Sequence, residues 1–278
     1  MFDGPVELRD PNSLVDSFAK TFCKFHSDSP SRAVFVTRDD TSHFGACSSV
    51  TVDKVCLTLG AISPRLTSGP DNIPCLLLAK CARVLSVPLC TIINCALRCG
   101  TFPVAWKRAK LTPVFKSGDP SSISNYRPIA RLCNFSKVLE KIVYEILFCA
   151  FIPVADANQH GFLKGKSTVT NLIVFCQFLS ESLSVVNQVD VVYTDFSKAF
   201  DRVGHAILCS KVNSLELPHS VKLLVQDYLT GRSHSVHYNG FNSFSFIPSS
   251  GVPQGSNLGP LLFAIFINDI GLKATYTC

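Results

Sequence analysis

The sequence lacks the long apolar runs that cross a membrane. No uninterrupted apolar stretch is longer than residues 261–267, which is far shorter than the roughly 20 residues that a spanning helix needs. The first residues also lack the basic segment followed by an apolar segment that marks a secretory signal. We therefore expect an intracellular protein in a reducing compartment, with no membrane partner.

Paired cysteine motifs are also missing. The 13 cysteines are odd in number, scattered, and contain no Cys-x-x-Cys pair, which disfavours a disulfide framework and a disulfide-linked partner. The closest cluster, Cys90, Cys95 and Cys99, has helical spacing and no histidine nearby, so a zinc site is not expected there. His234 and His237 are no better placed as metal ligands.

Acidic residues are fewer than basic ones, which gives a formal net charge of +6. This charge fits an anionic partner such as nucleic acid, although it does not identify one. The 278 residues are enough for one large domain or two small ones, and no internal repeat is visible. Composition therefore permits an enzyme without indicating its chemistry.

The N-terminal part is expected to differ from the rest. Asp10-Pro11 and the apolar residues that follow, up to Phe25, predict a capped amphipathic helix. Residues 27–49 are rich in Ser, Asp and Thr and predict a linker. We therefore divide the chain into residues 1–49, a helix and linker, and residues 50–278, the compact region.

Helices are expected to outnumber strands in the compact region, which predicts an α+β fold. Pro88 is expected to split the apolar pattern of residues 74–100 into two helices, with Gly100 as a C-terminal cap. Asn239-Gly240 predicts a two-residue hairpin turn. The remaining expected helices are 137–148, 169–183, 205–215, 220–229 and 258–267, and the expected strands are 110–115, 189–194, 233–238 and 241–247.

Asp195 follows the β-branched and aromatic residues 189–194, so it is expected at the end of a strand. A carboxylate at such an end keeps its charge and is able to meet a divalent ion and a triphosphate. An exposed aspartate without a function gives the same pattern. The segment alone does not separate the two interpretations.

Five ordered segments carry a resemblance to a known family. In order along the chain they are Ser68-Gly69-Pro70-Asp71-Asn72-Ile73-Pro74, Asn125-Tyr126-Arg127-Pro128-Ile129, Gln159-His160-Gly161-Phe162 through Ser167-Thr168, Asp195-Phe196-Ser197-Lys198-Ala199-Phe200-Asp201, and Gly251 to Pro260. Together they resemble the reverse transcriptase domain of non-LTR retrotransposons, the LINE class with jockey-like and CR1-like members. The resemblance covers roughly residues 60 to 270.

This resemblance implies a right-hand polymerase with fingers and a partial palm, mostly helical with a small antiparallel sheet. The implied activity is RNA-directed DNA polymerisation by two-metal nucleotidyl transfer. The implied partners are an RNA template, a DNA primer and deoxynucleoside triphosphates, and the implied localisation is the nucleus and cytoplasm. Two Mg²⁺ ions are the expected cofactors, since oxygen ligands suit them.

The resemblance also assigns roles to the Asp195 segment. It implies that Asp195 and the backbone carbonyl of Phe196 bind metal. Phe200 matches an aromatic that crowds the sugar 2′ position and selects deoxynucleotides, whereas the alternative is an ordinary core Phe. Asp201 is interpreted as structural.

Further positions match the family's nucleotide and template contacts. Gln254 and Gly255 lie in a loop that contacts the nascent base pair in the family, which is compatible with a tight turn before a helix. Lys116 and Arg127 match cations that face the triphosphate. Lys164 and Lys166 match template contacts, although for all four cations a solvated surface charge is the alternative.

The family continues into a hairpin with an Asp-Asp pair and then a thumb, and no Asp-Asp pair follows Asp195 in these residues. We therefore expect a fragment that ends before the second carboxylates, has no thumb and is inactive as written. The alternative is a non-catalytic RNA- or DNA-binding remnant of such a protein. A misfolded pseudogene product is a third possibility.

Overall fold

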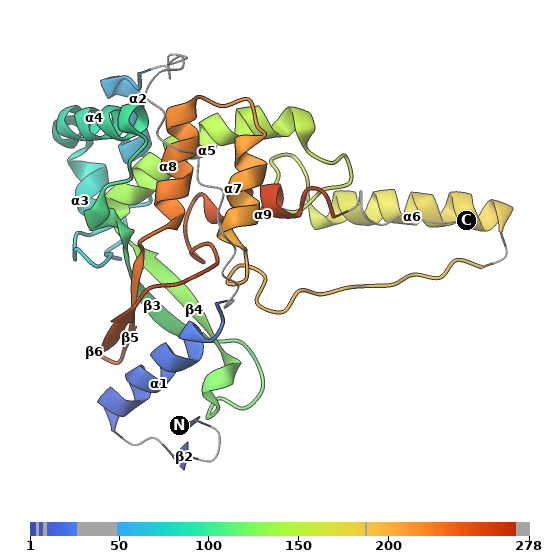
Figure 1. Cartoon of the computed structure of the whole chain (residues 1–278), viewed down its shortest axis with the longest axis horizontal. Helices are drawn as coiled ribbons and strands as arrows, with labels where there is room; N and C mark the ends of the chain where they lie inside the picture. The colour runs from blue at the N-terminus through green and yellow to red at the C-terminus, as the bar shows by residue number, and fades with distance from the viewer. Residues whose placement is uncertain (4–5, 8–9, 27–48, 187, 271–278) are drawn as a thin grey trace.

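The computed structural model describes residues 1–3, 6–7, 10–26, 49–186 and 188–270 (Figure 1). The short strands β1 (Phe2–Asp3) and β2 (Val6–Glu7) pair antiparallel near the N-terminus. Of the expected linker, 27–49, all but Ser49 lies outside the described residues. The division of the chain at residue 49 therefore stays a prediction.

The larger sheet has four strands in the order β4-β3-β5-β6. They are β3 (Arg108–Phe115), β4 (Tyr126–Leu132), β5 (Ser233–Tyr238) and β6 (Phe241–Phe246). The expected antiparallel sheet is wrong in one pairing, because β3 and β5 run parallel and the sheet is mixed. Parallel neighbours need a long crossover connection, and here the chain returns through several helices between β4 and β5.

The hairpin of β5 and β6 has the expected two-residue turn. Asn239 (φ 50°) and Gly240 (φ 86°) both adopt the left-handed conformation that this turn requires. The pairing shifts register between Ser235 and His237, so an irregularity interrupts the ladder that the turn begins. The turn is confirmed, and the bulge is a feature that the turn residues do not indicate.

Helix α1 (Pro11–Cys23) covers one face of this sheet (Figure 1). Its N-cap is Asp10, whose carboxylate accepts a hydrogen bond from Ser13 N at 2.8 Å, as the Asp-Pro start predicts. Phe18 is fully buried and its ring contacts those of Phe22, Tyr126 and Tyr238. The helix and the sheet therefore share one apolar core.

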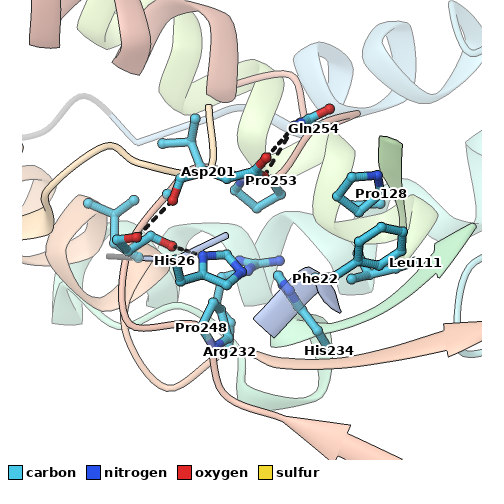
Figure 2. A pocket seen from close by; sticks show the side chains of 15 residues that line it. Phe22, His26, Leu111, Pro128, Asp201, Arg232, His234, Pro248, Pro253 and Gln254 are labelled. Atoms are coloured by element: carbon cyan, nitrogen blue, oxygen red, sulfur yellow. Dashed lines mark hydrogen bonds between the residues drawn. The ribbon is translucent and has the colours of Figure 1, made fainter. Parts of the chain in front are cut away.

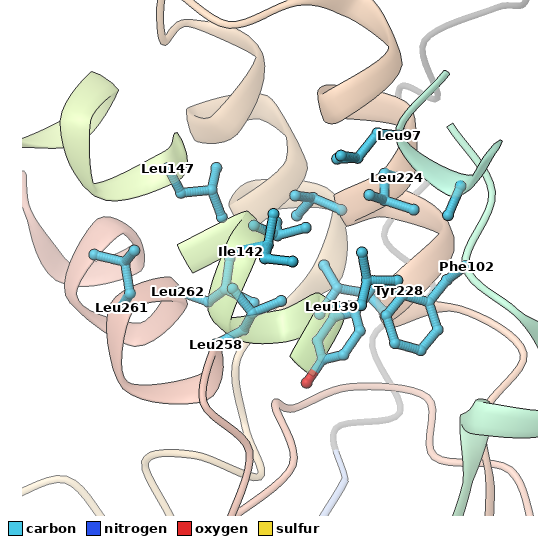
Figure 3. Close-up of a cluster of buried hydrophobic side chains, with 14 of the residues drawn as sticks. Leu97, Phe102, Leu139, Ile142, Leu147, Leu224, Tyr228, Leu258, Leu261 and Leu262 are labelled. Carbon is cyan, nitrogen blue, oxygen red and sulfur yellow. The ribbon is translucent and has the colours of Figure 1, made fainter. Parts of the chain in front are cut away.

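The main core lies among the other helices (Figure 3). These are α2 (Val52–Gly60), α3 (Cys75–Lys80), α4 (Ala82–Cys99), α5 (Asn134–Phe151), α7 (His205–Asn213), α8 (His219–Leu229) and α9 (Gly259–Ile267), with short 3₁₀ turns at Val104–Lys107, Ile123–Asn125 and Ile152–Val154. Lys107 pairs with Asp227 at 2.8 Å, which fixes α8 beside the start of β3. Since β5 follows α8, this contact helps to place β5 against β3.

The expected split at Pro88 is wrong. The helical pattern breaks at Cys81 (φ −97°, ψ 17°), and α4 continues through Pro88 to the left-handed cap at Gly100. Proline removes one backbone donor and crowds the carbonyl one turn earlier, that of Val84. Val84 is 77% exposed, so the crowded position lies on the solvent side of α4 and not in the core.

Helix α6 (Thr168–Val185) projects from the rest of the molecule and has no buried residue (Figure 1). The segment that follows it was expected to form a strand at 189–194, and this is wrong because the residues are extended without a strand partner among those described. A strand is stable only when a neighbour takes its backbone hydrogen bonds. The β-branched pattern alone cannot show whether such a neighbour exists.

Two helices, α4 and α6, are long and apolar enough to cross a membrane by length and composition alone. Neither helix is an uninterrupted apolar run, because polar residues interrupt both. In α4 the apolar residues include Leu89, Ile93 and Leu97, which are buried in the main core. A core helix of this kind passes the same test.

Replacing Phe18 with Ala is expected to lower the free energy of unfolding by about 3–5 kcal/mol, because it removes a fully buried ring between α1 and the sheet. Urea unfolding followed by circular dichroism measures the loss. Leu57→Ala is the control, since Leu57 is 72% exposed and should cost much less. An equal loss for the two variants would contradict the packing of α1 on the sheet.

Candidate active site

The loop 251–257 connects the β5–β6 hairpin to α9 and is held by its own backbone. Gly251 N donates to Val203 O and Val252 N donates to Phe200 O, each at 2.8 Å. The His205 ring donates from Nε2 to the carbonyl of Gly251 at 2.8 Å. The loop is thereby fixed against the segment that follows Asp195 in the sequence.

Two glycines allow this close approach. Gly251 (φ 92°) has the backbone of Asp201 beside it, and a Cβ there would lie 2.7 Å from the Asp201 carbonyl oxygen. Gly255 (φ 118°) lies against β4, where a Cβ would lie 2.6 Å from the Ala130 carbonyl oxygen. Ala130 N donates to Gln254 O at 2.7 Å across the same contact. Only glycine fits both the conformation and the space at these positions.

The side chain of Gln254 points to Asp201 (Figure 2). Its Nε2 donates to the two carboxylate oxygens of Asp201 at 3.1 and 3.0 Å. Ser250 Oγ donates to the Asp201 carbonyl at 2.7 Å. Burial raises the pKa of the Asp201 carboxyl to about 6, although the Gln254 hydrogen bond and the nearby Lys198 oppose the shift. Asp201 thus positions Gln254.

A second buried carboxylate holds the other end of the loop. Glu140 of α5 is fully buried, and its Oε2 accepts from Asn257 N at 2.7 Å while Oε1 accepts from Ser136 Oγ at 3.2 Å. Burial raises the pKa of Glu140, opposed by the nearby charge of Arg232 and by these hydrogen bonds. The loop is therefore tied to α5 as well as to Asp201.

A small cavity of about 20 Å³ lies under the loop, with Asp201, Arg232, His234 and His26 among its lining residues (Figure 2). Arg232 and His234 are 2% and 6% exposed, and Arg232 Nε and Nη2 and both His234 ring nitrogens lack hydrogen-bond partners among the described residues. Burial lowers the pKa of His234 to about 3, with Arg232 adding to the effect. The cavity has room for about one water molecule bridging these groups.

Phe200 lies beside the loop and is half-buried. Its ring stacks on Phe263 of α9 with centroids 5.0 Å apart and meets Phe162 edge-on at 5.6 Å. The ring is therefore packed on one side and partly open to solvent on the other. This placement is compatible with a contact to a nucleotide and also with ordinary core packing, so the predicted selection by Phe200 stays a prediction.

The structure does not bring Asp195 to this loop. Asp195 and Phe196 are exposed on the extended segment. Just after them, Lys198 Nζ lies 3.3 Å from the centroid of the Phe25 ring. Among the described residues, no group of three or more His, Cys, Asp or Glu side chains is arranged to hold a metal ion. A single carboxylate does not supply the donors that two ions need, so the described residues do not form a two-metal site.

The predicted cations lie at other places. Lys116 and Arg127 are exposed at the far end of the β3–β4 hairpin, where Val114 pairs with Arg127 and Lys116 N donates to Asn125 O at 2.9 Å. Lys164 is exposed in the turn before α6, and the Lys166 ammonium group donates to Ala157 O. The fold therefore groups Phe200, Gln254 and Gly255, and none of the four cations lines the cavity under the loop.

Several site residues were not found from the sequence. Glu140 lies in a helical apolar pattern, where a glutamate is typical of the exposed face. Arg232 follows a glycine turn, where a charged residue is typical of the surface. Their burial depends on contacts between distant segments, which a local pattern does not show. Asp201 was interpreted as structural, and its contact with Gln254 gives that interpretation a specific form.

Comparison with known proteins supplies the context of this geometry. Residues 114–275 match a family model described as "Reverse transcriptase (RNA-dependent DNA polymerase)". This match includes the loop, Phe200, Asp201 and Asp195, and it begins within β3.

Three relatives are similar over much of the chain. The probable RNA-directed DNA polymerase from transposon BS of Drosophila melanogaster is 30% identical over 231 residues, which are 82% of this chain and 25% of that protein. The RNA-directed DNA polymerase from mobile element jockey is 32% identical in Drosophila melanogaster (66% of this chain, 20% of the relative) and in Drosophila funebris (80% and 24%). The chain thus spans at most a quarter of the length of these relatives.

The raised pKa of Asp201 predicts a pH dependence of stability. Since the folded-state pKa of about 6 exceeds the ordinary 3.8, the folded chain binds this proton more tightly than the unfolded chain. The contribution of protonated Asp201 to the free energy of unfolding is fully present below about pH 4 and is lost as the pH rises through about 6. Asp201→Asn keeps an acceptor for Gln254 without a proton to lose.

The free energy of unfolding of Asp201→Asn, relative to the unmodified chain, should therefore rise by about 1–3 kcal/mol between pH 4 and pH 7.5. Urea titrations at several pH values measure this difference. Asp119→Asn is the control, because the pKa of that exposed carboxyl is lowered by its hydrogen bonds with Ser121 and it titrates below this range. A constant difference for Asp201→Asn would refute the buried, ionisable contact.

Gly255→Ala is expected to lower the free energy of unfolding by about 1–3 kcal/mol, because the positive φ and the Ala130 carbonyl both oppose a methyl group. Thermal melting measures the change. Gly60→Ala provides a matched control, since nothing lies within 4 Å of its added Cβ at the end of α2. If Gly255→Ala melts like Gly60→Ala, the close approach of the loop to β4 is wrong.

Proposed function

Because the chain belongs to the reverse transcriptase (RNA-dependent DNA polymerase) family, we propose that it forms the nucleotide- and template-contacting part of an RNA-directed DNA polymerase of a jockey-like non-LTR retrotransposon. The family follows from the match to residues 114–275, more than half of the 278 residues. The substrates of this proposal are an RNA template, a DNA primer and deoxynucleoside triphosphates. Its site of action is the nucleus, after synthesis in the cytoplasm.

The observation that carries the proposal is the anchoring of the loop 251–257. It is held between two buried carboxylates, Asp201 and Glu140, and its backbone packs directly on β4 at Ala130. A rigid glycine-containing loop presents backbone atoms at close range, which a nascent base pair requires for accurate contact. In this proposal Phe200, whose ring packs beside the loop, contacts the sugar of the nucleotide.

In this proposal the sheet and the adjoining helices form the fingers and part of the palm. The exposed end of the β3–β4 hairpin, with Lys116 and Arg127, forms the part of the fingers that meets the triphosphate, since guanidinium and ammonium groups bind phosphate oxygens well. Lys164 and Lys166 contact template phosphates. In this proposal residues 50–278 are the polymerase region, and residues 1–49, a helix and a linker, precede it.

Asp195 and the backbone carbonyl of Phe196 are the proposed protein ligands for Mg²⁺. Oxygen donors at an exposed position suit this ion, which retains several water ligands. The described residues provide one carboxylate of a site that needs more. A polypeptide limited to these 278 residues, in which no Asp-Asp pair follows Asp195, is therefore expected to bind substrates without extending a primer.

Fluorescence anisotropy with a labelled DNA primer on an RNA template tests the proposal. We expect saturable binding, weakened on the order of tenfold by Gln254→Ala, because the variant removes the side chain that stabilises the loop. Gln177→Ala on exposed α6 is the matched control and should bind like the unmodified chain. Absence of saturable binding by the folded, unmodified chain would contradict the proposed function.

Primer extension by the same polypeptide with Mg²⁺ and all four deoxynucleotides gives a second readout. No extension product is expected from the 278 residues. Nucleotide incorporation that is lost in Asp195→Asn would overturn the expected inactivity while supporting Asp195 as a metal ligand.

A further inference from the structure

A basic groove of about 310 Å³ lies between the segment 61–75 and α5. Its lining includes three cations, Arg65, Lys137 and Lys141, and contains no aspartate or glutamate. Arg65 lies outside the residues that match the family model.

The backbone that carries Arg65 is fixed. Its carbonyl accepts from Leu76 N at 3.0 Å. Asn134, which is 3% exposed, donates through Nδ2 to Thr67 O at 3.2 Å and to Ile73 O at 2.9 Å. One buried amide thus joins both ends of the turn around Gly69 to the first turn of α5. The guanidinium group of Arg65 extends from a defined position beside the helix.

Lys137 and Lys141 lie one turn apart on α5, so their charges share one face of the helix. Within the described residues, neither lysine nor Arg65 forms an ion pair. Of the acidic residues nearby on the helix, Glu145 pairs with Lys54 at 2.7 Å, and Glu140, whose charge interacts with that of Lys137, is fully buried against the loop. The groove is therefore lined by three cations and by no acidic residue, which favours an anionic occupant.

The groove adjoins the candidate active site. Asn257 lines it and donates through Nδ2 to Lys137 O at 2.9 Å, while its backbone N donates to Glu140. Asn257 lies three residues after Gln254 in the same anchored loop. A nucleic-acid strand that passes from Gln254 along Asn257 and α5 would reach Lys137 and Lys141 directly.

We propose that this groove binds the phosphate backbone of the single-stranded template that has not yet been copied. The inference rests on the proposed function for the identity of the strand. The cations come from two separate segments and are exposed or half-buried, which suits successive phosphates of a strand better than one enclosed ion. No aromatic side chain lines the groove, so binding is independent of sequence and does not involve base stacking.

The test compares two substrates, a primer–template with a long single-stranded 5′ template overhang and the same duplex with blunt ends. The variant is Arg65→Gln/Lys137→Gln/Lys141→Gln in the 278-residue chain. The matched control, Lys20→Gln/Lys80→Gln/Arg98→Gln, removes the same charge from exposed positions outside the groove. Anisotropy titrations at several salt concentrations give affinities and salt slopes, and circular dichroism checks folding.

We expect the groove variant to lose affinity for the overhang substrate on the order of tenfold, with a salt slope smaller by about 2, as three single-strand phosphate contacts predict. Affinity for the blunt duplex should be unchanged, and the control should retain the unmodified affinity for both substrates. Equal losses for the groove variant and the control, or an equal loss on the blunt duplex, would overturn the inference. Failure of the unmodified chain to bind either substrate would instead overturn the proposed function.

Lysine acylation of the unmodified chain gives a readout that needs no variant. Single-stranded RNA should protect Lys137 and Lys141 from an amine-reactive reagent, whereas Lys20 and Lys80 should react as in the free chain. Inorganic phosphate at the same phosphate concentration should give no protection. Protection by inorganic phosphate alone would identify a free-anion site and contradict binding of a strand.

Discussion

Two buried carboxylates determine how the loop 251–257 is presented. The Asp201 carboxylate accepts hydrogen bonds from the Gln254 side chain, and the Glu140 carboxylate accepts one from the backbone N of Asn257. The loop is therefore fixed at both its middle and its end. Burying a carboxylate is unfavourable unless hydrogen bonds compensate it, and these loop groups are the donors that do so. The loop and the carboxylates therefore depend on each other, and the contacts of β4, α5 and Phe200 follow from that arrangement.

The fixed loop contrasts with the segment that carries Asp195. Gly251 and Gly255 lie within van der Waals distance of other backbone, whereas Asp195 lies on an extended segment with no strand partner among the described residues. The segment reaches the loop at Phe200, whose carbonyl accepts from Val252 N, and at Asp201, which accepts from Gln254. The structure thus gives a rigid setting to the loop proposed to contact the base pair and an exposed, extended setting to the residue proposed to bind metal.

Local chemistry was predictable from the sequence where one or two residues determine it. Asn239-Gly240 fixes the hairpin turn and Gly100 caps α4, because both need left-handed backbone. Features that depend on distant partners were not predictable: the parallel pairing of β3 with β5, and the missing strand before Asp195. At the site, the sequence motif predicted Gln254 as a site residue. The burial of Glu140 was not predictable from the sequence, because only tertiary contacts create it.

The packing of α1 on the hairpin sets an order for folding. Residues 11–23 contact β6, which lies more than 200 residues later in the chain, so this interface has a very large sequence separation. Such contacts form slowly because a long loop must close first. During synthesis the aromatic face of α1 remains without its final partner until residues 233–246 have emerged. Chaperone binding to Phe18 and Phe22 in that interval would protect the nascent chain from aggregation.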